Sequence, residues 1–337
     1  MDCFVTGGSG FIGSNLVHEL VARGHRVRVL LRPDSVCRCL EDVPYEPVVG
    51  NLLDLPGLVK VMRGCQWCFH VAASYHLWLP DYCPMYETNV EGTRTVLRAA
   101  IETDCSRIVY TSTVGCIGLL PANGSAAPPA DETLPASESM MANDYKRSKW
   151  RAEQVALGLA GEGAPIIVVN PSAPAGPRDA KPTPTGKFIL DFLNREMPGY
   201  IHTGLNWVHV RDVAIGHILA AERGRIGQRY ILGNTEGNWT MEEVLRTLSE
   251  LTGVRAPRFR IPYLAALAAA HVDESVASIT GRPPKAVLAG VRMARNTMFY
   301  SSAKAVRELG LPQTSPRRAL ADSVQWFRQN GYVRGSN

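Results

Sequence analysis

The sequence contains no long hydrophobic run and no long run of basic residues. Its longest apolar stretch, residues 263–270, is far shorter than the roughly 20 residues that cross a bilayer. The first apolar run starts at Cys3, which leaves no room for a secretory signal. A net charge of +5 is small for 337 residues, so nucleic acid is not an expected partner. We therefore expect a cytoplasmic protein with no transmembrane segment.

The sequence also lacks a cysteine pattern suited to zinc. All eight cysteines lie within the first 116 residues. Cys65 and Cys68 have the spacing of a zinc pair but run into an apparent strand, and the other close pair, Cys37 and Cys39, has the wrong spacing. No metal is predicted, and the thiols are expected to be reduced and partly buried.

A glycine-rich segment at residues 6–13, with the sequence TGGSGFIG, is the most informative feature that is present. It follows a short apolar run and precedes the alternating stretch 26–31, the order strand, turn, helix, strand in which such turns bind dinucleotides. Gly7 permits the tight turn, Gly10 lets backbone N–H groups approach a pyrophosphate, and Gly13 lets the helix pack closely on the strand. A tight turn without a ligand is the alternative.

Strand and helix patterns alternate through the first two thirds of the chain, which predicts an α/β fold with a doubly wound parallel sheet. Further strands are expected at 67–71, 107–111, 165–170, 207–210 and 229–232. Helices are expected at 55–63, within 84–101, at 143–159 and at 212–222. A loop rich in Pro, Ala and Gly is expected at 119–135.

The pattern divides the chain into two parts. We expect a Rossmann domain at 1–170, to which 207–235 returns, and a smaller, mainly helical substrate lobe formed by 171–206 and 236–337. In this lobe Thr240 and Glu243 form a capping box that predicts the start of a helix. An apolar helix at 261–272 fits a core or dimer contact best, and contact with a lipid-like substrate is the alternative.

Tyr145 and Lys149 lie four positions apart, a spacing that places both side chains on one face of a helix. A phenol loses its proton near pH 10, which is high for a base at neutral pH, and a neighbouring ammonium would lower its pKa. The pair is therefore a candidate acid/base site. A surface tyrosine beside a solvated lysine is the alternative.

These two motifs, together with 89–93, 110–113, 170–172 and 207–214, resemble the extended short-chain dehydrogenase/reductase superfamily of the NAD-dependent epimerase/dehydratase type. Within the superfamily, longer strings resemble hopanoid-associated sugar epimerases and the neighbouring dihydroflavonol 4-reductases. They lie at 70–78, 170–179, 181–186 and 291–295. The resemblance implies a Rossmann fold, a nicotinamide cofactor and a sugar, polyol or ketone substrate in hopanoid metabolism. It also implies a homodimer formed through the two long helices.

The resemblance implies roles for individual residues. Tyr145 would be the acid/base, Lys149 would hold the nicotinamide ribose and lower the pKa of Tyr145, and Thr113, or otherwise Ser112, would donate a hydrogen bond to the substrate oxygen. The implied cofactor contacts, besides the three glycines and the Tyr-Lys pair, are Phe11, Ile12, Asp54, Leu55, Ala72, Ala73, Asn89, Thr111, Pro171, Ser172 and Ala173. Asn51 and Ala173 depart from the usual Asp and the frequent Thr of the family.

Cofactor choice depends on the end of the second strand, where an acidic residue would favour NAD. Arg32 lies 19 positions beyond Gly13, and its guanidinium suits a 2′-phosphate. NADP is therefore our first choice and NAD the alternative. On the substrate side, the candidates in stretches expected to face the cleft are Ser74, His76, Trp78, Arg178, Lys187 and His202.

Together these patterns predict an oxidoreductase that moves a hydride between nicotinamide and a secondary alcohol or ketone carbon. An epimerase, which returns the hydride to the same sugar, and a reductase, which releases oxidised cofactor, both fit. A non-catalytic protein that senses the cofactor is a further alternative, against which the retained Tyr145, Lys149 and Thr113 count.

Overall fold

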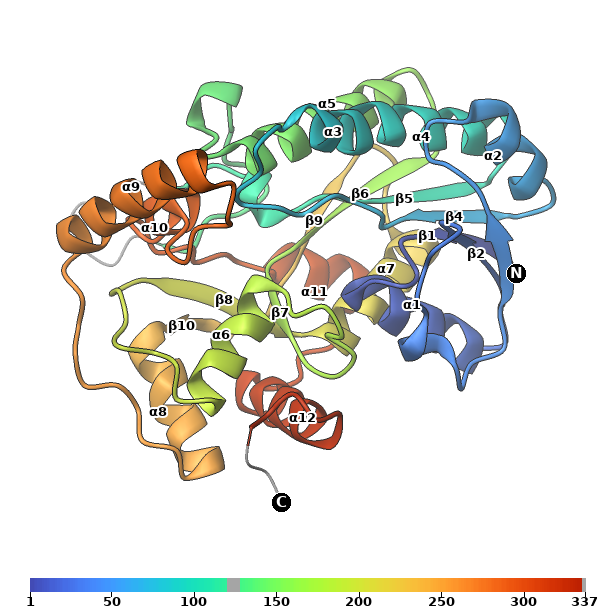
Figure 1. Ribbon diagram of the computed structural model, residues 1–337. Coiled ribbons are helices and arrows are strands. Elements are labelled where there is room, and N and C mark those ends of the chain that lie inside the picture. Colours follow the sequence, from blue (N-terminus) through green and yellow to red (C-terminus); the bar gives the residue numbers. More distant parts are fainter. Residues whose placement is uncertain (120–127, 335–337) are drawn as a thin grey trace.

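The computed structural model describes residues 1–119 and 128–334 (Figure 1). The part of the expected loop at 119–135 that covers 120–127 lies outside the described residues. The described chain forms two packed units, a large parallel sheet between two helical layers and a second unit around a small sheet.

The large sheet has seven strands, all parallel, which confirms the predicted doubly wound α/β fold. The strand order is β3-β2-β1-β4-β5-β6-β9. The bounds are β1 Asp2–Thr6, β2 Arg26–Leu31, β3 Glu46–Val49, β4 Trp67–His70, β5 Arg107–Thr111, β6 Ile166–Pro171 and β9 Arg229–Leu232. Sequence analysis missed β3, since it has four residues and contains Pro47, a residue that sheets tolerate at an edge, where β3 lies.

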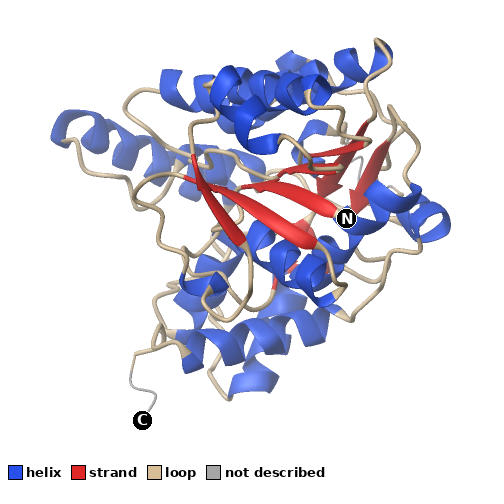
Figure 2. Ribbon diagram, turned by 90° about the vertical axis from the view of Figure 1, so that its right-hand side faces the viewer, coloured by secondary structure: helices blue, strands red, loops and turns tan. Residues whose placement is uncertain are grey.

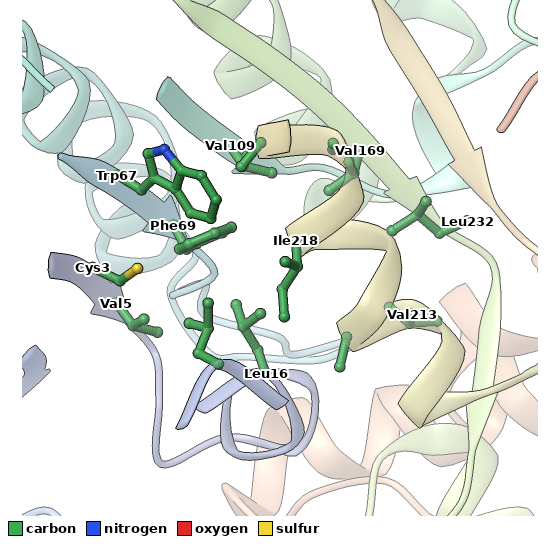
Figure 3. Packing of buried hydrophobic residues seen from close by; sticks show 14 of the residues in the cluster. Cys3, Val5, Leu16, Trp67, Phe69, Val109, Val169, Val213, Ile218 and Leu232 are labelled. Atoms are coloured by element: carbon green, nitrogen blue, oxygen red, sulfur yellow. The ribbon is translucent and has the colours of Figure 1, made fainter. Parts of the chain in front are cut away.

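Helices cover both faces of this sheet (Figure 2). One face packs against α1 Phe11–Ala22, α7 Val210–Arg223 and α11 Ala303–Leu309. The other packs against α2 Leu55–Met62, α4 Gly92–Glu102 and α5 Asp144–Gly161. Figure 3 shows the first layer, in which strand residues such as Val5, Phe69 and Val109 meet Leu16 of α1 and Ile218 of α7. Burial on both faces accounts for the continuous apolar runs of the strands.

The expected helix within 84–101 is divided into three parts, α3 Cys83–Tyr86, a π-helical turn η2 Glu87–Glu91 and α4. Such turns occur frequently at functional sites, and this one carries Asn89. Three short 3₁₀ turns complete this unit, η1 Arg38–Leu40, η3 Val114–Cys116 and η4 Glu138–Met140.

The second unit contains a three-stranded sheet, in the order β10-β8-β7, with helices packed against it. The strands are β7 Ala173–Ala175, β8 Gly204–His209 and β10 Asn238–Thr240, and the helices are α6 Pro184–Leu193, α8 Met241–Thr252 and α12 Pro316–Gln329. The stretch 207–210, expected to return to the parallel sheet, instead belongs largely to β8 of this small sheet. The chain returns through α7 and β9.

Two more helices, α9 Tyr263–Thr280 and α10 Leu288–Met293, pack on each other at the edge of this unit (Figure 1). The predicted capping box at the start of α8 is confirmed, because Thr240 accepts from the backbone N–H of Glu243 and the Glu243 carboxylate accepts from that of Thr240. All eight cysteines are free thiols, and burial raises the pKa of Cys65 to about 11 and that of Cys116 to about 12.

The glycine-rich turn between β1 and α1 is packed too closely for side chains. Gly7 has φ +73°, and a Cβ there would lie 2.6 Å from the backbone nitrogen of Ala72, two residues after β4. A Cβ on Gly13, inside α1, would lie 2.1 Å from the carbonyl oxygen of Gly7. The absence of a side chain at both glycines therefore lets α1 and the segment after β4 approach the turn closely, as the sequence predicts.

We expect Gly13→Ala to destabilise the protein by about 1–3 kcal/mol, because the added methyl group has no space. Gly158→Ala is the matched control, since Gly158 also lies inside a helix but a Cβ there meets nothing within 4 Å. This control should be neutral or stabilising by up to about 1 kcal/mol. Urea unfolding of both variants measures the difference, and equal stabilities would contradict the packing described.

Candidate active site

The chain reverses its direction across the sheet between β1 and β4, and doubly wound sheets bind ligands at the carboxyl ends of the strands beside such a switch point. Thr6, at the end of β1, accepts a hydrogen bond from the Ala72 backbone N–H (3.2 Å) and is bonded to His70 Nδ1 (2.7 Å). Burial lowers the pKa of His70 to about 3, so this imidazole is neutral and structural. The predicted cofactor residues that end or follow strands lie at this edge, namely Gly7, Arg32, Ala72, Ala73, Thr111, Pro171 and Ser172.

The start of α1 has the chemistry of an anion site. Its N-cap is Gly10, no side chain caps the helix, and the first turn has no acidic residue. The first turn includes Phe11 and Ile12, whose N–H groups lack intrahelical partners as in any helix. With the close-packed glycines around it, this open helix end fits a dinucleotide pyrophosphate.

The residues expected at the adenosine end lie beyond β2 and β3. Arg32 is exposed directly after β2, and its guanidinium forms no ion pair in the described parts of the chain. Asp54 caps α2, which begins at Leu55, by accepting from the Gly57 N–H (3.1 Å). Asn51 accepts from the Leu53 N–H (3.1 Å). These two side chains stabilise the loop before α2.

Tyr145 lies in the first turn of α5, half-buried. Asn143 caps this helix by accepting from the Lys146 N–H (2.8 Å), which fixes the start of the helix. The ring of Tyr75, from the loop after β4, packs edge-on against the Tyr145 ring with centroids 4.2 Å apart. The expected helix therefore forms, and it places the phenol beside the loop that follows β4.

Asn89 connects that loop to α5. Its carboxamide accepts from the Ser74 N–H (2.7 Å) and donates to the Ser74 carbonyl (2.9 Å) and to Ser148 Oγ (2.9 Å). Ser148 Oγ in turn donates to the Tyr145 carbonyl (2.8 Å). Since every link is short and Asn89 is buried, this network fixes the position of the loop relative to Tyr145.

Lys149 is buried and connects α5 to the end of β5. Its ammonium donates to the Thr111 carbonyl (2.7 Å) and lies 4.6 Å from the centre of the Tyr110 ring. Burial lowers its pKa to about 8. Thr111 is itself oriented by His217, whose Nε2 lies 2.9 Å from the threonine hydroxyl.

The pKa of Tyr145 differs from the sequence expectation. We expected the Lys149 ammonium to lower it, whereas burial, reinforced by Tyr75 and Cys116, raises it well above the usual value. The pKa of Tyr145 is raised and not lowered because the Lys149 ammonium is held at Thr111 and the phenol lies against the Tyr75 ring. In the protein alone, Tyr145 is therefore a protonated phenol.

Thr113 and Ser112 follow β5 and differ in what their hydroxyls do. Thr113 Oγ1 accepts from the Gly115 N–H (3.1 Å), which leaves its own O–H free to donate. Ser112 Oγ is buried and forms no hydrogen bond with the described residues. The turn η3 that follows packs on α5, so Thr113 lies on the same side of the sheet edge as that helix.

A buried acidic group that sequence analysis missed lies one helical turn after Lys149. Glu153 accepts from Asn170 Nδ2 (2.8 Å) and pairs with the Arg229 guanidinium (3.3 Å), and burial raises its pKa. The same Asn170 side chain donates to the Thr113 carbonyl (2.9 Å). Glu153 therefore holds the end of β6 and Thr113 together. The sequence signal that could have identified Glu153 is its position four residues after Lys149, on the same helix face.

The remaining cofactor candidates lie at the junction of the two sheets. Ser172 Oγ donates to Asn206 Oδ1 (3.0 Å), and its N–H donates to the Leu232 carbonyl. Ala173 is buried at the start of β7. Both residues directly follow β6, so they lie beside the carboxyl end of the sheet.

The substrate candidates fall into two groups. Ser74, His76 and Trp78 lie in the loop that also carries Tyr75, next to Tyr145. The others lie elsewhere: Arg178 bonds to Asn15 and His18 of α1, Lys187 pairs with Asp191 on α6, and His202 lies 3.5 Å from Glu242. The structure thus places the loop that carries the first group beside Tyr145.

An uncapped helix N-terminus at the switch point of a doubly wound sheet is the arrangement by which dehydrogenases hold NAD(P), and this chain has both features. The NAD dependent epimerase/dehydratase family matches residues 3–233, and the chain belongs to this family. The protein is therefore an NAD(P)-dependent enzyme of the extended short-chain dehydrogenase/reductase superfamily, as the sequence resemblance implies.

Relatives match nearly the whole chain. A provisionally named dihydroflavonol 4-reductase of Synechocystis sp. is 47% identical over 99% of this chain and 96% of its own. Sterol demethylase protein B of Methylococcus capsulatus is 32% identical over 99% of this chain and 100% of its own. A 4-hydroxy-2-methyl-3-oxo-4-farnesyl-3,4-dihydroquinoline-1-oxide ketoreductase of Stigmatella aurantiaca is 34% identical over 92% and 91%.

A solved structure shares the fold across both units. The structure of a nucleoside-diphosphate-sugar epimerase from Pseudomonas aeruginosa superposes with a TM-score of 0.82, at 26% identity, over 99% of each chain. The second unit is therefore part of the shared architecture.

The buried Lys149 gives a test based on pH. Its pKa is about 8 in the folded protein and 10.5 ordinarily, so between these values the unfolded chain binds more protons and the lysine contributes stability that increases with pH. Relative to Lys149→Met, the wild type should gain about 2–3 kcal/mol from pH 7 to pH 11. Denaturant unfolding across this range measures the gain. The exposed Lys187→Met is the control, and parallel curves for Lys149→Met would contradict a perturbed lysine.

Proposed function

We propose that the protein is an NADPH-dependent reductase that converts a ketone carbon of a largely apolar small molecule into a secondary alcohol. The observation that carries this proposal is the protonated phenol of Tyr145, which packs against Tyr75 of the loop at 72–78. A phenol that keeps its proton is suited to donate one to a carbonyl oxygen.

The reaction divides between cofactor and chain. Bound NADPH supplies the hydride that adds to the carbonyl carbon. Thr113 donates a hydrogen bond to the carbonyl oxygen and so favours the negative charge that develops there. Tyr145 transfers its proton to the same oxygen, and Lys149, with its ammonium at the end of β5, would hold the ribose hydroxyls.

The cofactor preference rests on Arg32. In the described chain its guanidinium is exposed and without an ion pair at the end of β2, where a 2′-phosphate would lie. Residues 1–170 with 207–235 would hold the cofactor. The segments 171–206 and 236–337 would form the substrate side, although β8 belongs to the small sheet.

The substrate class rests on the relatives. Two of them carry reductase or ketoreductase in their names, and two name a sterol or a farnesyl-bearing ring. Sterol and farnesyl groups are mostly hydrocarbon, which fits a hopanoid-linked or other apolar substrate.

A sugar epimerase is the second candidate, favoured by the similarity to the nucleoside-diphosphate-sugar epimerase. Tyr145 would then remove a proton from a hydroxyl and later return it. An epimerase needs its cofactor to remain bound, so mass spectrometry of the purified protein separates the two. Retained NAD(H) supports the epimerase, and an empty protein that takes up NADPH supports the reductase.

We expect Tyr145→Phe to lower kcat for ketone reduction by about 100-fold or more, because the proton donor is lost, while NADPH affinity changes little. Tyr300→Phe is the matched control, since its hydroxyl is buried with no hydrogen-bond partner among the described residues. Absorbance at the NADPH band follows both variants. Unchanged turnover in Tyr145→Phe would contradict the mechanism, and NADPH binding with no turnover on any ketone would favour a cofactor sensor.

We expect Arg32→Ala to lower kcat/KM for NADPH by about 10–100-fold, as befits a lost charge-assisted hydrogen bond, and to leave that for NADH nearly unchanged. Arg98→Ala, at an exposed arginine of α4, is the control. Steady-state kinetics with both cofactors measure the ratio. Equal losses for NADPH and NADH would contradict 2′-phosphate recognition.

A further inference from the structure

The outward face of α9 is an exposed apolar ridge, which we define as Leu264, Val272, Val276 and Ile279. These side chains are 75%, 66%, 50% and 86% exposed, and the exposed residues between them include Ala268, Ala269, His271 and Ser275. The opposite face buries Ala266, Ala270 and Ala277. The helix is thus apolar on two sides, with one side covered by α10 and the other uncovered at the edge of the molecule (Figure 1).

The only acidic residues of α9 are turned away from this ridge. The Asp273 carboxylate accepts from the Ala286 N–H (2.7 Å), and the Glu274 carboxylate accepts from the Leu288 N–H (2.8 Å), so both stabilise the connection to α10. The sequence of α9 contains no lysine or arginine. The ridge itself therefore carries no charge.

Basic residues precede and follow the ridge in the sequence. Segment 253–295 contains seven exposed Lys/Arg and two acidic residues, a net charge of +5. The rest of the chain has 29 of each sign, so this segment accounts for the entire net charge. In the described structure none of the seven forms an ion pair; they are Arg255, Arg258, Arg260, Arg282, Lys285, Arg292 and Arg295.

We propose that the α9 ridge docks on a membrane surface that contains anionic phospholipids. An interfacial helix buries its apolar side chains at the level of the acyl chains while flanking cations contact lipid phosphates, and both parts are present here. Phe259, 63% exposed between Arg258 and Arg260, adds an exposed apolar side chain five positions before the ridge. Among the described helices, none has the length and hydrophobicity of a membrane span.

A second copy of the chain fits this face less well. A symmetric dimer would bring the same patch of two molecules together. The unpaired cations of one copy would then face those of the other, with no exposed carboxylate on the ridge to offset them. Anionic phospholipid headgroups supply the missing charge, which is why we favour a lipid surface.

The ridge adjoins the proposed substrate side. A Cβ on Gly290 of α10 would lie 3.8 Å from Leu77, which belongs to the loop that carries Tyr75 beside Tyr145. Docking through α9 would therefore bring the loop next to the catalytic phenol close to the lipid surface. An apolar ketone could then pass from the bilayer to the site. This role in substrate entry rests on the proposed function, whereas docking itself does not.

Vesicle co-sedimentation of the full chain tests the docking. We expect binding to vesicles of phosphatidylcholine with one-third phosphatidylglycerol, and at least tenfold weaker binding to phosphatidylcholine alone. Val276→Asp/Ile279→Asp should weaken binding to the anionic vesicles about tenfold or more. Arg282→Gln/Lys285→Gln should weaken it and reduce its salt dependence. Ile226→Asp is the matched control, at an apolar residue 47% exposed far from α9 in the sequence, and should bind as the wild type does.

Turnover of a small water-soluble ketone separates this inference from the proposed function. All the variants should reduce such a ketone at the wild-type rate, so weaker vesicle binding with unchanged turnover supports docking. Wild type that stays in the supernatant with both vesicle types overturns docking, as does equal binding by wild type and Val276→Asp/Ile279→Asp. If the wild type forms a dimer and binds no lipid, and Val276→Asp/Ile279→Asp dissociates that dimer, the ridge contacts a second copy of the chain and the proposal is overturned. Vesicle binding without ketone turnover would overturn the reductase and leave the docking supported.

Discussion

The hydrogen bond from the buried Lys149 ammonium to the Thr111 carbonyl is the interaction on which the site depends. The ammonium bonds to this last carbonyl of β5 and lies against the Tyr110 ring, so it fixes α5 on the sheet where the strands end. Glu153 extends the same helix face and holds the end of β6 through Asn170. One helix carries Tyr145, Lys149 and Glu153 at intervals of four residues. Its attachment to the sheet therefore positions the Tyr145 phenol and also Asn170, which Glu153 holds and which bonds to the Thr113 carbonyl.

Much of the fold follows from local patterns in the sequence. The glycine-rich turn, the alternation of strands and helices, and the capping box at Thr240 depend on contacts close in the chain or on burial on both faces of a sheet. The Tyr145–Lys149 spacing likewise predicts a shared helix, which the structure has. Family resemblance added the cofactor class, which the family match confirms.

The parts that sequence analysis missed depend on distant contacts. β8 contains a run that looks like any buried strand, and only its partners β7 and β10 place it in the small sheet. The pKa of Tyr145 rises because Tyr75, 70 positions earlier, covers the phenol while the ammonium is held elsewhere. The sequence also does not show that the basic residues near α9 lack acidic partners. That follows from the structure, in which Asp273 and Glu274 accept from the backbone of Ala286 and Leu288.

The central claim is that Tyr145 and Lys149 face the reactive end of a bound nicotinamide cofactor. A crystal structure of the complex with NADP⁺ tests it most directly. The account predicts the pyrophosphate at the start of α1, the ribose hydroxyls within hydrogen-bonding distance of the Lys149 ammonium, and the Tyr145 hydroxyl facing the nicotinamide ring. A complex in which the nicotinamide lies away from α5, with Lys149 still bonded only to Thr111, would contradict it.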